Sequence, residues 1–246
     1  MGMELCGWYS TLMSVPYREY RDEYIRENHM PLATQVWPPD GWDLSLRHQR
    51  DLMELGFVNR APLTSAKGIQ SHVRRSLSEN SNSRALVAAR LLRDGSHSPM
   101  ESRLYARYCL PRRHGGLNLN PVELNAKIQL TDEIAEATGK REYSVDLYWP
   151  KGNIAIEYEG SFAHSGISAE ARDRLKRNIL EAKGIRIISI DKAQYANEDM
   201  LEFHGVEIAK SMGIKPETLA PNARESRARH ALIDAVNSWD TDLYRP

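Results

Sequence analysis

The stretch Y-S-V-D-L-Y-W-P-K-G-N-I-A-I-E-Y-E-G-S-F-A-H, residues 143–164, decides the fold that we predict for this chain. Residues 143–149 and 154–158 are rich in β-branched and aromatic side chains, which favour strands. The segment between them contains Pro150 and Gly152, which favour a turn. The pattern therefore predicts an antiparallel hairpin.

Three carboxylates of this hairpin predict a site for a divalent cation. Side chains alternate between the faces of a strand, so Glu157 and Glu159 point the same way, and the returning strand brings Glu157 close to Asp146. Like charges this close repel each other unless a cation neutralises them, and carboxylate oxygens favour Mg²⁺ or Mn²⁺. The alternative is that all three are solvent-facing strand residues, as most acidic residues are. The apolar residues 154–156 between them argue against it.

The composition is that of a soluble globular protein without excess charge. The chain has 246 residues, 41% of them hydrophobic, and 33 basic side chains balance 33 acidic ones, so any contact with nucleic acid must come from local basic patches. Cys6 and Cys109 are too few for a disulfide framework or a zinc site, which favours a reducing cytoplasm. No apolar run approaches the roughly 20 residues of a membrane span, and no signal segment opens the chain.

The order of helical and strand-like segments predicts three regions. Residues 1–95 form a small, mainly helical N-terminal region, residues 96–213 form the domain that contains the hairpin, and residues 214–246 form a helical tail. We expect helices at 64–79, 83–93, from Ser98 to about 110, 168–183, 197–212 and 224–239, a strand at 185–190, and short strands or extended connections at 117–119 and 126–130. The hairpin, the helix after it and the next strand make a β-β-α-β unit.

This order resembles the PD-(D/E)XK restriction-endonuclease-like superfamily, most closely its very short patch repair endonuclease-like domains, as found in uncharacterised actinobacterial proteins. An acid-bearing apolar strand precedes Gly160 and His164. It is followed by a D-x-x-x-R helix at residues 173–177 and an L-x-x-x-G turn at residues 180–184. The likeness covers about residues 96–213. It implies an α/β fold with a restriction-endonuclease-like core, a mixed central sheet flanked by helices.

The resemblance also implies roles for the acidic residues and the histidine. Asp146 and Glu157 are expected to bind Mg²⁺ (or Mn²⁺), with a further ligand from Glu159 or the strand backbone, and Glu101 is expected to complete the acidic site. His164 is expected to act as a general base or to contact the scissile phosphate. The alternative for His164 is an ordinary loop residue that follows a glycine turn.

Basic residues of the helix at 168–183 are expected to serve the same site. Arg172, Arg177 and Lys176 are candidates for binding the phosphate or bracing the acidic residues, and the alternative is a solvated, salt-bridged helix face. The superfamily's usual lysine, two residues beyond the second acid, is replaced here by Glu159. We expect Lys176 or His164 to take its place.

The function that these features favour is a metal-dependent nuclease that hydrolyses DNA phosphodiester bonds, in repair or defence. The alternative is a non-catalytic DNA-binding or antitoxin-like regulator that retains the nuclease fold, because Glu159 stands where a lysine is expected. DNA is the expected partner and a membrane is not. Trp8, Trp37 and Trp42 leave room for a homodimer or a protein partner.

Overall fold

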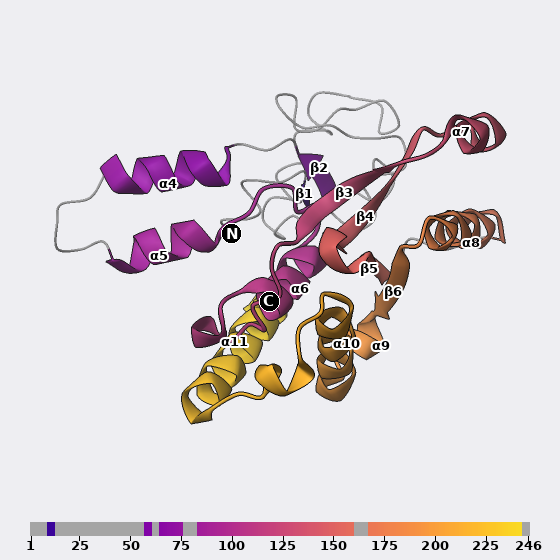
Figure 1. Cartoon of the computed structure of the whole chain (residues 1–246). Helices are drawn as coiled ribbons and strands as arrows, with labels where there is room; N and C mark the ends of the chain where they lie inside the picture. Colours follow the sequence, from indigo (N-terminus) through magenta and orange to yellow (C-terminus); the bar gives the residue numbers. More distant parts are fainter. Residues whose placement is uncertain (1–8, 13–56, 61–63, 76–82, 160–166, 243–246) are drawn as a thin grey trace, which may run out of the picture. The chain divides into compact units, whose positions relative to one another are not determined.

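The computed structural model (Figure 1) describes residues 9–12, 57–60, 64–75, 83–159 and 167–242. The chain divides into two compact units. One unit comprises Met1–Ser102 with Asp240–Pro246, and the other comprises Arg103–Trp239. The predicted hairpin and most of the candidate site residues lie in the second unit.

The described part of the first unit contains two short strands and two helices. Strand β1 (Tyr9–Leu12) pairs antiparallel with β2 (Phe57–Arg60), a pairing that the sequence did not predict. Helices α4 (Ala66–Arg75) and α5 (Ser83–Leu91) confirm the two helices expected there.

Helix α6 (Pro99–Cys109) starts in the first unit and continues into the second. The Ser98 hydroxyl accepts a hydrogen bond from the backbone N–H of Glu101 at 3.2 Å, and Pro99 occupies the first helical position. Both features are typical of a helix N-terminus, and they confirm the predicted start of this helix.

The second unit is an α/β structure built on a four-stranded mixed open sheet in the order β3-β4-β5-β6. The strands are β3 (Glu123–Gln129), β4 (Glu142–Trp149), β5 (Ile154–Glu159) and β6 (Arg186–Asp191). Strands β3, β4 and β5 pair antiparallel, and β5 pairs parallel with β6. The predicted hairpin is therefore confirmed, with a 3-10 turn at Pro150–Gly152 between β4 and β5.

Helices flank this sheet, and most of them follow the sequence expectations. They are α7 (Asp132–Thr138), α8 (Ile167–Ala182), α9 (Lys192–Tyr195), α10 (Glu198–Ser211) and α11 (Ala223–Asp242). Only α7 and α9 were not expected. Each had a signal in the sequence: Gly139 ends α7 in a left-handed conformation, and Asp191 forms a capping box with Gln194 at the start of α9.

One face of the sheet packs against α6 and α10. Trp149 is fully buried, meets the ring of Tyr108 edge-on at 6.3 Å and donates from Nε1 to the carbonyl of Leu119 at 2.8 Å. The hydroxyl of Tyr108 donates to the carbonyl of Leu201 on α10 at 3.1 Å. Ile154 pairs with Trp149 in the ladder and lies on the same face.

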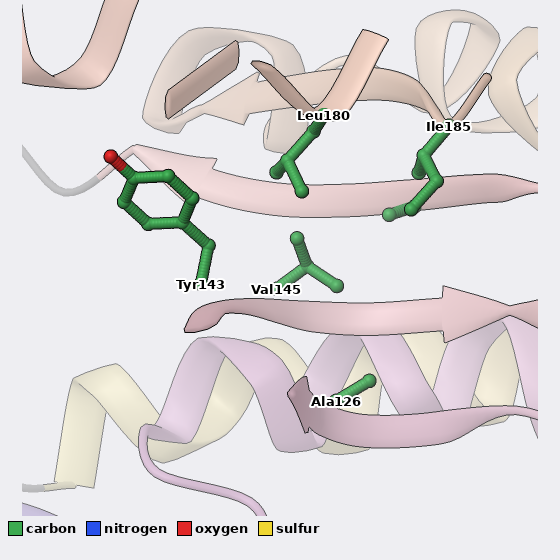
Figure 2. Close-up of a cluster of buried hydrophobic side chains, with 6 residues drawn as sticks. Ala126, Tyr143, Val145, Leu180 and Ile185 are labelled. Atoms are coloured by element: carbon green, nitrogen blue, oxygen red, sulfur yellow. The ribbon is translucent and has the colours of Figure 1, made fainter. Parts of the chain in front are cut away.

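Helix α8 is anchored on the sheet by a cluster of buried apolar side chains. Figure 2 shows Leu180 and Ile185 pointing toward Val145 of β4, with Tyr143 and Ala126 beside it. Leu180 and Val145 are both fully buried. The last turn of α8 is therefore part of the hydrophobic core.

The β3–β4 ladder is interrupted at one position. Leu124 pairs with Leu147 and Ala126 with Val145, but Asn125, which lies between them, forms no bridge. Asn125 also has a φ of 48°, a left-handed conformation that asparagine tolerates better than most residues. The distortion lies opposite Asp146, the first of the predicted metal ligands.

Candidate functional site

The structure brings Asp146 and Glu157 together at the centre of the sheet. Leu147 pairs with Ile156 in the antiparallel ladder, so continuing this register by one residue places Asp146 opposite Glu157. The pairing stops there because Asp146 Oδ2 accepts a hydrogen bond from the backbone N–H of Tyr158 at 2.8 Å. At the end of the ladder, the side-chain carboxylate of Asp146 therefore accepts the Tyr158 N–H in place of a backbone carbonyl.

The electrostatic surroundings of Asp146 are those of a carboxylate held in a confined acidic site. Burial raises its pKa to about 6, and the negative charge of Glu157 acts in the same direction. The Tyr158 hydrogen bond and the positive charge of Lys176 oppose this shift but do not cancel it. Asp146 therefore carries its negative charge at a cost, which a cation would relieve.

Glu157 is paired with Lys176 of α8. The ammonium group of Lys176 contacts Glu157 Oε1, and the exposed fractions of the two side chains are 23% and 22%. Oε1 is buried, and Lys176 is the cation that neutralises it among the described residues.

Glu159 does not join this pair of carboxylates. Its Oε1 lies 3.0 Å from the guanidinium of Arg177, which also donates to the hydroxyl of Ser189 on β6. Glu159 and Arg177 are both exposed. Within the described ranges, no three histidine, cysteine, aspartate or glutamate side chains gather closely enough to hold a metal ion.

Helix α8 sets the positions of the two basic side chains, Lys176 and Arg177, that contact these acids. Leu180 anchors the helix in the core, and Lys176 lies one turn earlier on the same side, where it reaches the sheet above Glu157. Arg177, the next residue, is rotated toward Glu159. The predicted D-x-x-x-R helix thus supplies Lys176 and Arg177 to the acidic end of β5.

Three predicted site residues remain, Glu101, Arg172 and His164. Glu101 is buried in the first unit, where its Oε2 accepts the backbone N–H of His97 at 2.7 Å, next to the start of α6. Arg172 is exposed on α8. His164 lies outside the described residues, as do Trp8, Trp37 and Trp42 for the proposed partner surface.

Two neighbours of the site were not anticipated from the sequence. Ser189 pairs with Glu157 across the β5–β6 ladder and receives Arg177. Asn125 distorts β3 beside Asp146. No sequence motif marks either residue as a neighbour of the site. For Asn125 there was one weaker signal, since asparagine adopts a left-handed backbone conformation more readily than most residues.

Asp146 and Glu157 are the residues of this site whose oxygens could hold a metal ion. Mg²⁺ is usually held by one or two carboxylates and keeps several of its waters. Asp146 and Glu157 supply two carboxylates; Asp146 accepts the backbone N–H of Tyr158, and Glu157 is in contact with Lys176. Lys176 contributes a positive charge at the same place.

Comparisons with protein-family models, with curated proteins and with solved structures found no match to this chain. Among the helices of the described ranges, none is both long enough and apolar enough to cross a lipid bilayer.

Proposed function

We propose that this protein is a metal-dependent nuclease with a restriction-endonuclease-like core that hydrolyses DNA phosphodiester bonds in repair or defence. The observation that carries the proposal is the opposition of Asp146 and Glu157 on adjacent strands, with Lys176 in contact with the second acid. The β-β-α-β order of the unit and the mixed sheet are compatible with such a core. Mg²⁺ or Mn²⁺ is the proposed cofactor.

The residues of the site divide the work between binding and charge balance. Asp146 and Glu157 would hold the cation, which when bound would supply an activated water and positive charge for the phosphate. Tyr158 fixes the orientation of Asp146 through its backbone N–H. Lys176, whose partner Glu157 is then neutralised by the cation, would turn its ammonium group toward the negative charge of the phosphate.

This assignment gives Lys176 the place of the lysine that the superfamily carries on the strand. Glu159 occupies that strand position. Among the described residues it forms an ion pair with Arg177, whereas Lys176 forms one with Glu157. The ammonium group therefore reaches the acids from α8 instead of from β5.

The test is DNA cleavage with matched variants. The wild-type protein should cleave supercoiled or linear DNA with Mg²⁺ or Mn²⁺, and Asp146→Asn and Glu157→Gln should each lose more than about 100-fold in rate. Glu142→Gln is the control, because Glu142 is also on β4 but pairs with Lys127. Absence of metal-dependent cleavage of any nucleic acid by the wild type would refute the proposal.

A second candidate is the non-catalytic DNA-binding or antitoxin-like regulator. The observation in its favour is that Lys176 and Arg177 already neutralise Glu157 and Glu159 without a metal. Calorimetry separates the two: a nuclease should bind Mg²⁺ or Mn²⁺ and lose this binding in Glu157→Gln. A regulator should show salt-sensitive DNA binding with no heat of metal binding.

A further inference from the structure

The two ends of α8 have different surroundings. Its last turn is fixed in the core by Leu180, which is fully buried. Earlier in the helix, every side chain from 171 to 175 is exposed, and so are those of Arg177 and Asn178, while Lys176 is half-buried against Glu157. The helix therefore leaves the sheet within one turn of the acidic pair and continues into solvent.

One line of side chains runs along α8 from the core through the site to solvent. Leu180, Lys176 and Arg172 are spaced four residues apart, so they lie on the same side of the helix. Arg172 is thus about 6 Å beyond Lys176 along the helix axis. Its side chain is exposed and makes no ion pair or hydrogen bond with any residue in the described ranges.

Arg172, Lys176 and Arg177, the three residues that the sequence predicted to bind phosphate, therefore have different surroundings. Lys176 is in contact with the acid pair, and Arg177 is held by Glu159 and Ser189. Arg172 alone of these three keeps all its donors available, and a guanidinium is suited to bidentate binding of a phosphate.

We propose that Arg172 binds a phosphate next to the scissile one, so that the site selects polynucleotides over small phosphodiesters; this rests on the proposed nuclease function. Lys176 contacts the acid pair and Arg172 lies one helical turn beyond it, so Arg172 would meet the next phosphate of a strand whose scissile phosphate is bound at the pair. A mononucleotide or an isolated diester has no group for Arg172 to bind. The ligand class is a nucleic-acid strand with an intact phosphate beside the cleavage point.

Two measurements test this proposal. The first is the affinity for a short fluorescein-labelled DNA duplex with Ca²⁺ in place of Mg²⁺. Arg172→Ala should weaken binding by about 3- to 10-fold and reduce the salt dependence by about one phosphate contact, and Arg172→Lys should restore part of the loss. Arg174→Ala is the control, because Arg174 is equally exposed but lies on the opposite side of the helix, so it should change affinity by less than about 2-fold.

The second measurement compares DNA with bis-para-nitrophenyl phosphate as substrates in Mg²⁺ or Mn²⁺. Arg172→Ala should raise KM for DNA with little change in kcat, and should leave hydrolysis of the small diester unchanged. Equal losses on both substrates would place Arg172 at the scissile phosphate and overturn the proposal. So would unchanged DNA affinity in Arg172→Ala, or an equal loss in Arg174→Ala.

Failure of the underlying function gives a different result. If the wild type hydrolyses neither substrate, the nuclease proposal fails, and with it the selection between substrates. The binding measurement still reports whether Arg172 contacts DNA. If the wild type hydrolyses both substrates and Arg172→Ala behaves as the wild type does, only the role of Arg172 is refuted.

Discussion

Replacing Asp146 by asparagine should stabilise the protein at neutral pH while it removes metal binding. Burial and the nearby charge of Glu157 raise the pKa of Asp146 from 3.8 to about 6, so its ionised form is disfavoured in the folded state. Each pKa unit corresponds to about 1.4 kcal/mol, which gives an upper value of about 3 kcal/mol. Because Asp146 keeps some contact with solvent, we expect the variant to gain about 1–2 kcal/mol.

The gain should depend on pH in a defined direction. Well below pH 3.8, Asp146 is protonated in the folded and unfolded states, and its contribution to stability is fully present. As the pH rises from 3.8 to about 6, the unfolded state loses its proton while the folded state keeps it, and the wild type loses that stability. Asparagine has no proton to lose, so the difference should be small at about pH 4 and complete above about pH 7.

Urea denaturation at several pH values, with a chelator present, measures this difference. Glu142→Gln is a control of opposite sign, since hydrogen bonds from Lys127 and Gln129 lower the pKa of Glu142 on the same strand. Replacing the Glu142 carboxylate by glutamine should therefore not stabilise the protein at neutral pH. A lower stability of Asp146→Asn at neutral pH, or a gain that does not change between acidic and neutral pH, would refute the confined acidic site.

Three further predictions concern the scaffold that holds the site. Leu180→Ala should cost about 2–5 kcal/mol of stability and loosen α8, whereas Leu175→Ala, at a position 45% exposed, should change the free energy of unfolding by less than about 0.5 kcal/mol. Gly115→Ala should lower the melting temperature more than Gly139→Ala, although both glycines have positive φ. A Cβ at Gly115 would lie 2.4 Å from a backbone oxygen of α11, whereas a Cβ at Gly139 would meet no atom within 4 Å. Ile156→Asp should abolish cooperative unfolding, since this side chain is fully buried, and a normal melting curve would show that the strand faces are misassigned.

Local patterns were sufficient for the elements around the site. The hairpin followed from two β-rich runs and a Pro-Gly turn, and the end of α8 followed from Gly184, which has a φ of 79°. The start of α6 followed from Ser98 and Pro99. These signals act over a few residues, so they can be read without knowing what packs against them.

The site itself was predictable only in part. Strand alternation and the short turn brought Glu157 opposite Asp146, as expected. The same reasoning placed Glu159 beside them, but its carboxylate lies against Arg177, which also donates to Ser189. Alternation fixes the face of a side chain, whereas its partner depends on which helix covers that face.

The sequence by itself determined the hairpin, the helix and strand after it, and the identity of two opposed acids, because these depend on local conformational preference and on the spacing of residues along one strand. Only the tertiary structure decided how the basic residues of α8 are used. Leu180 fixes the helix on the sheet, and this contact places Lys176 at Glu157, Arg177 at Glu159 and Arg172 in solvent. Such placement depends on packing between elements distant in the chain, for which a helical repeat carries no information.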